Sequence, residues 1–445
     1  MSFHSENRLD PSERARVPFP RSRRLIPERG SRRRNAVNQL VAVAAVFGVG
    51  AGGWGLWLET RDHSDRSASR DRIAKACAGL VDPEQVLDLN GGTARARAGS
   101  EEDDSMGDLD TASKPAQCEI YRVGKSGTTH FHFLLSVWSN PSDDFAQLVS
   151  GWDDPFGMMG GAAKADVTRE AEQTAAYPIG DGRLGVYYGN TAVVKAKCTN
   201  KSGGTTSINT MTVAKYSDVD PVTDADRRTI VGLARTAAVR AAKKLGCEAE
   251  LPALPAELPT PSAKLVSAKS VGGTCGWYAG YIAAKGRGRL PDRALAAPAA
   301  HAQEESCLLG VSNEEVREMW PDLDKDEVPN NSLDDVIRIS PFWLRTDSYF
   351  GDEAREVATA HFGKDQRPLA FGTAGHDSSE KVWWASSTCA GQPAVHTLSV
   401  EYPYIGVVQK RLQALFKAYV TDVTARRGCT GLKFPVAATF QPSET

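Results

Sequence analysis

The chain has 445 residues, of which 41% are hydrophobic and 24% are charged. These values are ordinary for a folded protein and exclude a wholly disordered or collagen-like chain. The formal net charge of −2 at pH 7 argues against a surface devoted to nucleic acid, so we expect no nucleic-acid partner. At roughly 150 residues per domain, the length predicts about three structural units.

The N-terminal part of the sequence is typical of a membrane anchor. Residues 1–34 hold ten arginines and four acidic residues, and residues 35–58 are 24 consecutive uncharged residues. Because about 20 apolar residues cross a bilayer as a helix and a basic flank stays inside, we predict a cytoplasmic tail at 1–34 and a single transmembrane helix at 35–58. Trp54 and Trp57 lie near the outer end, where indole rings prefer the headgroup region.

A cleaved signal peptide is the alternative, but the span ends without an Ala-x-Ala site, which favours a retained signal-anchor in the cell membrane.

All the cysteines follow the predicted span: Cys77, Cys118, Cys198, Cys247, Cys275, Cys307, Cys389 and Cys429. An even number of cysteines on the predicted outer side indicates disulfide bonds in an oxidising compartment. No Cys-x-x-Cys spacing occurs, which argues against a zinc knuckle or a redox centre. The C-terminal part is therefore expected to be extracytoplasmic and cross-linked.

Two stretches of the sequence, 183–247 and 368–429, share one order of expected elements. Each reads as a strand, a strand ending in cysteine, a strand, a helix and a Gly-Cys pair. We therefore expect two diverged copies of one module. The predicted organisation is a juxtamembrane linker at 59–76, module 1 at 77–250, a Pro-rich linker at 251–261 and module 2 at 262–445.

Weaker matches lie upstream in each copy. Cys118-Glu-Ile-Tyr resembles Cys275-Gly-Trp-Tyr, and Phe133-Leu-Leu-Ser-Val resembles Cys307-Leu-Leu-Gly-Val. These matches predict that Cys118 and Cys275 are equivalent positions.

Each copy ends in a predicted amphipathic helix. Apolar residues recur at helical spacing in both copies: Ile230, Ala234, Ala237, Ala241 and Leu245, then Val408, Leu412, Leu415, Tyr419 and Val423. A helix packed on antiparallel strands places the fold in the α+β class. The cysteine directly after each helix can reach the strand that ends in cysteine, which predicts the pairs Cys198–Cys247 and Cys389–Cys429. Cys77–Cys118 and Cys275–Cys307 are weaker predictions, because eight cysteines allow 105 connectivities.

Signatures of catalysis and metal binding are weak in this sequence. We find no Gly-x-Ser-x-Gly elbow, no His-Glu-x-x-His pair and no phosphate-binding loop. His130 and His132 share a strand face without a visible third ligand, and the acidic runs at 101–104 and 322–326 read as solvated loops. We therefore predict no catalytic residues, no metal and no cofactor.

A glycine-rich apolar segment at 150–161 is the predicted binding surface. Trp152, Phe156, Met158 and Met159 lie among four glycines without strand or helix periodicity. Flexible apolar loops of this kind can form adaptable binding surfaces. The alternative is that the segment covers the core of its own module.

The overall layout resembles a known group of proteins. An Arg-rich tail, a span ending in Gly53-Trp54-Gly55-Leu56-Trp57, the start Cys77-Ala-Gly-Leu-Val-Asp-Pro and paired cysteine modules resemble the single-pass envelope proteins of unassigned function found in actinobacteria. The resemblance implies an envelope location and supplies no catalytic residues.

Two functions follow as expectations. The first is a membrane-anchored, non-enzymatic module that binds an envelope protein partner or another envelope ligand. The second is a cell-surface hydrolase whose site combines unlike residues of the two copies. Convergence of His376, Asp377, Ser378 and Lys381 in one deep pocket would favour the hydrolase, whereas scattered, exposed positions for these residues would argue against an enzyme.

Overall fold

The computed structural model describes residues 32–99, 116–124, 126–140, 147–157, 166–199, 205–214, 222–249, 251–328, 331–359 and 366–441. Within these ranges, nothing is described of the side chains at 32–35, 38 and 48–60, so much of the predicted span at 35–58 lies outside the described side chains. Met158, Met159 and the acidic run at 101–104 also lie outside the described residues. The described part of the chain contains no helix with the length and apolar character needed to cross a membrane.

The chain divides into two units, Met1–Ser64 and Asp65–Thr445. Helix α1 (Arg32–Ala76) provides the described residues of the first unit and continues into the second. The second unit is a mixed α/β structure with antiparallel sheets.

The first sheet of the second unit has the strand order β1-β2-β3-β8-β7-β6-β5 in the described residues. Its strands are β1 (Ala96–Ala98), β2 (Ala116–Val123), β3 (Thr129–Asn140), β5 (Tyr177–Pro178), β6 (Gly185–Tyr188), β7 (Thr191–Thr199) and β8 (Thr205–Ala214). Helices α2 (Pro83–Asp88) and α3 (Asp224–Lys244) accompany it. The 3-10 turn η2 (Val167–Arg169) precedes β5 in the chain, and its Val167 packs with Leu308 and Trp343 of the other large sheet.

The second sheet has the order β9-β10-β11-β12-β17-β16-β15, with β18 paired to β16. Its strands are β9 (Val266–Ser267), β10 (Arg293–Ala296), β11 (Glu304–Gly310), β12 (Trp343–Phe350), β15 (Gly375–Asp377), β16 (Val382–Cys389), β17 (Gln392–Val400) and β18 (Cys429–Lys433). The helices are α4 (Gly276–Lys285), α5 (Asn313–Met319), α6 (Leu333–Arg338) and α7 (Tyr402–Arg427). The 3-10 turns are η3 (Gly273–Cys275), η4 (Trp320–Asp322), η5 (Glu353–Arg355) and η6 (Ala437–Phe440). A small third sheet joins β14 (Arg367–Pro368), β13 (Val357–Thr359) and β4 (Gln147–Val149).

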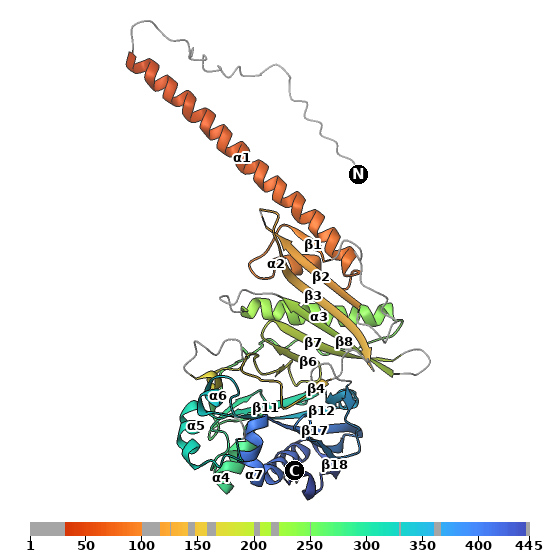
Figure 1. Cartoon of the computed structure of the whole chain (residues 1–445). Coiled ribbons are helices and arrows are strands. Elements are labelled where there is room, and N and C mark those ends of the chain that lie inside the picture. Colours follow the sequence, from red (N-terminus) through yellow and green to blue (C-terminus); the bar gives the residue numbers. More distant parts are fainter. Residues whose placement is uncertain are drawn as a thin grey trace, which may run out of the picture. The chain divides into compact units, whose positions relative to one another are not determined.

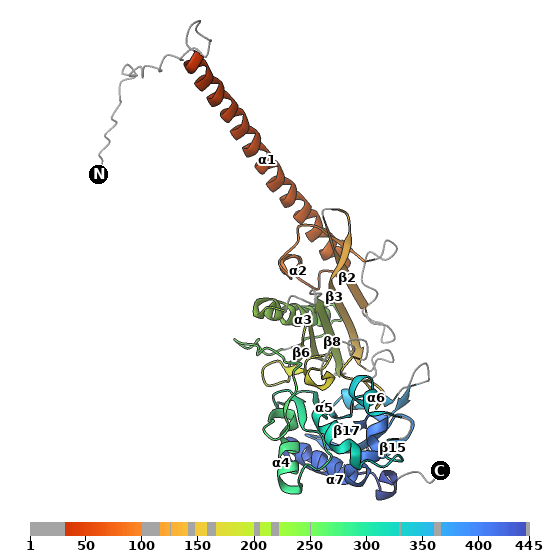
Figure 2. The same cartoon turned by 60° about the vertical axis from the view of Figure 1, so that its left-hand side comes forward.

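The two large sheets match strand by strand. The order β1-β2-β3-β8-β7-β6 in the first corresponds to β10-β11-β12-β17-β16-β15 in the second. Each sheet carries one long helix after its last shared strand, α3 or α7. Figure 1 shows α3 crossing β7 and β8, and Figure 2 shows α4 and α7 side by side at the second sheet.

The upstream sequence matches align the copies wrongly. Cys118 lies in β2, whereas Cys275 ends the 3-10 turn before α4, so the equivalent of Cys118 is Cys307 in β11. Pro368 belongs to β14 in the small sheet, and the strand equivalent to β6 is β15. Short apolar segments from different strands have similar sequences. A match over four or five residues therefore does not identify which strands are equivalent.

Helix α3 forms as its sequence predicts. Thr223 caps its start by accepting a hydrogen bond from the Asp226 amide at 3.1 Å. Its apolar stripe, made mostly of alanines, is buried against the first sheet: Ile230, Ala234, Ala237 and Ala241. Alanine is the strongest helix former, and its short side chain lets the helix approach the strands closely. The same residues therefore favour the helix and its packing on the sheet.

Helix α7 buries a larger stripe on the second sheet: Leu412, Leu415, Tyr419 and Val423. It ends at Gly428, which has φ of 63°, the left-handed conformation that glycine adopts without steric cost. The cysteine after this cap lies beside the end of β16, with Cys389 and Cys429 in register.

The four disulfides join Cys77 to Cys118, Cys198 to Cys247, Cys275 to Cys307 and Cys389 to Cys429. These are the predicted pairs. Within the described residues, no cysteine is free. The cysteines that lie in strands occupy equivalent strands of the two sheets. Cys118 in β2 corresponds to Cys307 in β11, and Cys198 in β7 corresponds to Cys389 in β16.

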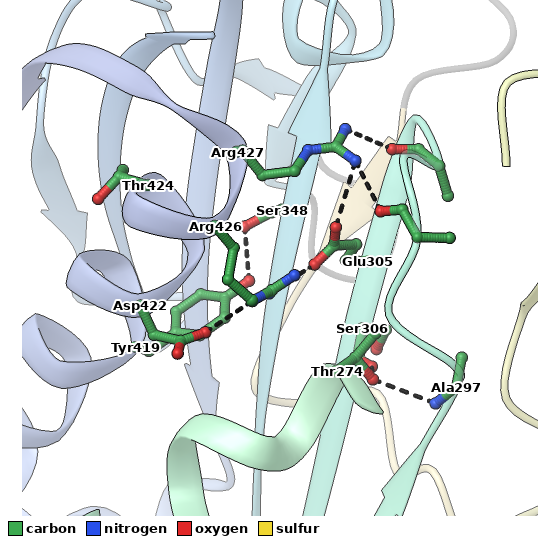
Figure 3. A network of polar contacts seen from close by, with 12 residues as sticks. Thr274, Ala297, Glu305, Ser306, Ser348, Tyr419, Asp422, Thr424, Arg426 and Arg427 are labelled. Atoms are coloured by element: carbon green, nitrogen blue, oxygen red, sulfur yellow. Dashed lines mark hydrogen bonds and ion pairs between the residues drawn. The ribbon is translucent and has the colours of Figure 1, made fainter. Parts of the chain in front are cut away.

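An ion-pair network fixes the end of α7 to the second sheet (Figure 3). Arg426 donates to the Glu305 carboxylate at 2.8 Å, and Arg427 approaches the other oxygen of that carboxylate at 3.4 Å. Arg427 also donates to the carbonyls of Ala300 and Ala302, each at 2.7 Å. The Glu305 side chain is only 4% exposed, so its charge depends on these two arginines.

Candidate ligand-binding cavity

A cavity of about 1340 Å³ lies between the two large sheets, and side chains of both sheets line it. Adjacent residues of a strand point to opposite faces. Each sheet therefore has one face packed on its helix and one face free to form a cavity wall.

In the first sheet, the helix-facing side chains include Thr210 and Thr212, whose hydroxyls donate to the carbonyls of Ala234 and Ile230 in α3. Asn209 and Met211 alternate with these threonines on β8 and point the other way. Together with side chains of β6 and β7, they form the first wall of the cavity: Val186, Tyr188, Val193, Lys195, Asn209 and Met211.

In the second sheet, Glu304 and Glu305 show the same alternation. Glu305 faces α7 and binds its arginines, whereas Glu304 lines the cavity. On β12, Ser348 bonds to Tyr419 of α7 at 2.6 Å, and Asp347 beside it lines the cavity. Other residues complete this wall: Leu295, Ser306, Leu308, Arg345 and Tyr349.

The predicted binding segment forms a third side of the cavity. Trp152 donates its indole N–H to the Ser379 carbonyl at 2.8 Å and stacks on Tyr402 with ring centroids 5.2 Å apart. Phe156 is 4% exposed and packs in a hydrophobic cluster with Leu308 and Trp343 of the second sheet. Both Trp152 and Phe156 line the cavity. The described part of the segment, residues 150–157, therefore packs on the sheet of the other copy and not on the core of its own module.

Close backbone approach holds this segment in place. The amide of Gly151 donates to the Glu380 carbonyl at 2.7 Å, and the Ser150 hydroxyl donates to the Glu380 carboxylate at 3.0 Å. A Cβ atom at Gly151 would collide with the Val400 carbonyl, so only glycine fits without a shift. Next to it, β4 pairs in parallel with β13.

A second link between the sheets is ionic. Lys195 of β7 is 3% exposed and lies 2.7 Å from Glu353 and 3.2 Å from Asp352, which follow β12. Ser207 of β8 also donates to Asp352 at 2.5 Å. The ammonium of Lys195 is thus neutralised by carboxylates of the opposite half of the unit.

The cavity is rich in acidic groups. The described lining residues include eight carboxylates: Asp153, Asp154, Glu170, Glu172, Glu304, Asp347, Glu353 and Glu356. Only Lys195 and Arg345 are cationic among the same lining residues, and each forms an ion pair with a carboxylate. The wall as a whole therefore carries excess negative charge.

This environment changes the pKa of several lining groups. Burial, as the main cause, and the nearby Asp347 carboxylate raise the pKa of Glu304 to about 7, although Arg345 opposes the shift. Burial and Glu304 together raise the pKa of Tyr188 on the opposite sheet. Burial also raises the pKa of Asp154, with Glu172 adding to the effect. Glu304 therefore changes charge near neutral pH.

The residues chosen to discriminate a hydrolase do not converge in this cavity. None of His376, Asp377, Ser378 and Lys381 is among the described residues that line it. Asp377 accepts hydrogen bonds from the amide and hydroxyl of Ser379, and Lys381 donates to the Ser378 carbonyl at 2.6 Å. His376 stacks on Trp383, and burial lowers its pKa to about 4. These residues form a hydrogen-bonded turn between β15 and β16.

The two histidines with metal-ligand spacing are separated by a bulge. His132 is buried and bonds to the Val86 carbonyl at 2.8 Å, whereas His130 is exposed. In the ranges that the structure describes, no group of three His, Cys, Asp or Glu side chains could hold a metal ion.

Sequence reasoning overlooked the central cavity residues, Lys195, Glu304, Arg345 and Asp347. Their signal was a charged residue inside a strand that otherwise reads as buried, as in Ala192-Val-Val-Lys-Ala. Such a charge costs several kcal/mol unless it is paired or faces water, so it marks either an ion pair or a site.

The comparisons with known proteins give no relative. No protein-family model, no curated protein and no solved structure matches this chain.

Proposed function

We propose that this chain is a membrane-anchored, extracytoplasmic binding protein whose ligand site is the cavity between the two large sheets. The observation that carries the proposal is the cavity itself, about 1340 Å³ in volume and lined by side chains of both sheets and of the segment containing Trp152. Large cavities with mixed aromatic and polar walls are the usual sites of small ligands. The matching strand orders support two diverged copies of one module, and both copies contribute lining residues to this site.

Of the two kinds of ligand left open by the sequence, a small envelope ligand fits better than a protein partner. Phe156 is packed inside the unit, and Trp152 is stacked on Tyr402, so both rings already have intramolecular partners. Both residues line the cavity. We therefore assign Trp152 and Phe156 to the wall of an internal site.

A blocked cavity tests the proposal. Val193 is a cavity-lining residue of the first sheet, and Val239 is 38% exposed on α3. We expect Val193→Trp to abolish the rise in melting temperature that a screened envelope metabolite produces in the full chain, because the indole would occupy the site. Val239→Trp, the matched control, should keep that rise. Ligands that stabilise both variants equally, or a screen without any stabilising compound, would contradict an internal site.

The membrane anchor and its orientation belong to the same proposal. Support comes from the uncharged stretch at 35–58, the arginines before it and the disulfides after it, which are typical of oxidising compartments. We expect trypsin added to intact cells to digest the part after residue 59 and to spare an epitope tag at the N-terminus. A tag that is digested from outside, or a chain that is recovered in the soluble fraction, would contradict the anchor.

A cell-surface hydrolase is the second candidate, and one feature of the cavity favours it. Glu304 and Asp347 lie diagonally across β11 and β12, since Ser306 pairs with Asp347 and Glu304 with Tyr349. Diagonal neighbours are about 7 Å apart, and two carboxylates with different protonation are what glycoside hydrolysis needs. Oligosaccharides shortened by the wild-type chain and left intact by Glu304→Gln would favour this candidate over simple binding.

A further inference from the structure

We infer that the cavity between the sheets binds an elongated organic cation with more than one ammonium group. This inference rests on the proposed function and names the ligand class of that site. It is carried by the sign and distribution of the lining charges, by the aromatic walls and by the size of the cavity.

The charges are distributed over the whole wall. Glu170 and Glu172 come from the segment after η2, Glu304 and Asp347 from the second sheet, and Glu353 from η5. Both cations in the wall are already satisfied, Lys195 by Glu353 and Arg345 by Asp347 at 3.2 Å. A ligand that brings further positive charge would meet the remaining carboxylates, whereas an anion would be repelled by them.

One carboxylate in the wall is only half satisfied. Glu353 uses its Oε1 atom for Lys195, and its Oε2 atom is buried without a hydrogen-bond partner among the described residues. A buried carboxylate oxygen without a partner costs free energy, and the charge of a bound cation would offset part of that cost. A positively charged group of the ligand therefore suits this position.

Aromatic rings provide the second kind of contact. Trp138, Trp152, Tyr188 and Tyr349 line the cavity together with the carboxylates. Aromatic faces attract alkylammonium groups, and this attraction strengthens where water is excluded. Carboxylates combined with aromatic rings therefore favour an organic cation. A metal ion is disfavoured, since the described residues hold no group of three metal ligands.

The cavity volume and the positions of its acids indicate the size of the ligand and the spacing of its charges. Sites for compact small molecules are about 300–1,000 Å³. This cavity has about 1340 Å³ and carries acids along several sides, so it suits a ligand with charges at separated positions.

The test uses hexamethonium, whose two quaternary ammonium groups keep their charge at every pH. We expect it to bind the full chain about tenfold more tightly at pH 8 than at pH 6, because Glu304, with its pKa near 7, ionises between them. The charged and titratable groups that face Glu304 are Arg345, Asp347, Tyr349, Glu353 and Tyr188.

Glu304→Gln should weaken hexamethonium binding at pH 8 and remove the pH dependence. Glu318→Gln, which changes an exposed acid of α5 outside the cavity, should leave both unchanged.

Adipate and 1,6-hexanediol provide the anionic and neutral comparisons in the same titrations. One outcome would be that adipate or 1,6-hexanediol binds wild type, fails to bind Val193→Trp, and hexamethonium does not bind. This would overturn the cationic ligand class while leaving an internal site in place. Hexamethonium that binds wild type and Val193→Trp equally would overturn the location. Failure of hexamethonium to bind at either pH would overturn the inference itself.

Discussion

Replacing Cys389 and Cys429 together with alanine is expected to lower the free energy of unfolding by about 4 kcal/mol. The bond closes a loop across 40 residues and joins the end of β16 to the first residue of β18, which follows the Gly428 cap of α7. Without it, the unfolded chain regains the conformational entropy that the closed loop had removed. The denaturant midpoint of the full chain, followed by tryptophan fluorescence without reductant, measures this loss.

The equivalent bond in the other copy provides the comparison. Cys198 and Cys247 close a loop across 49 residues, so the chain-entropy argument predicts a loss of similar size for their double alanine variant. A midpoint that stays at the wild-type value for both double variants would show that the disulfides contribute little to stability.

Glu305→Gln is expected to destabilise the folded chain by about 3 kcal/mol. The substitution removes the charge that Arg426 and Arg427 share, and the side chain of Glu305 is 4% exposed. We expect the lower end of the range for broken buried ion pairs, because Arg426 keeps its contact with Asp422 at 2.8 Å. Denaturant unfolding of the full chain at pH 7 measures the loss.

The neighbouring acid is a matched control for this prediction. Glu304 lies one residue away on the opposite face of β11, where it lines the cavity and forms no ion pair within the described residues, since the nearby Arg345 pairs with Asp347. Glu304→Gln should change stability by less than about 1 kcal/mol at pH 7, where the carboxyl is already partly protonated. An equal loss of unfolding free energy in Glu305→Gln and Glu304→Gln would contradict our assignment of one face of β11 to the packing of α7 and the other face to the ligand.

Local patterns in the sequence predicted the helices and disulfides well. The recurring alanines from Ala234 to Ala241 identified the face that α3 buries, and Gly428 identified the end of α7. The Gly-Cys pairs after both helices indicated two disulfides, which the structure confirms. These features succeed because each depends on residues within a few turns of one another.

The cavity could not be predicted in this way. The adjacency of Glu304 and Glu305 implies opposite faces, but nothing nearby in the sequence says which face a helix covers. The contact of Ser150 with Glu380 joins residues 230 positions apart, and it helps to hold the segment of Trp152 that lines the cavity. Only the packing of one sheet against the other brings Lys195, Glu304 and Tyr188 to one site.

The most direct test of the account is a crystal structure of the protein with hexamethonium, grown at pH 8. We predict density for the ligand between the two large sheets, with one ammonium group near Glu304 and the other within reach of a second lining carboxylate. Tyr188 from the first sheet should contact the same ligand, which would show that both copies contribute to one site. Density on the outer surface, for example at the turn of His376 to Lys381, together with an empty cavity, would contradict the account.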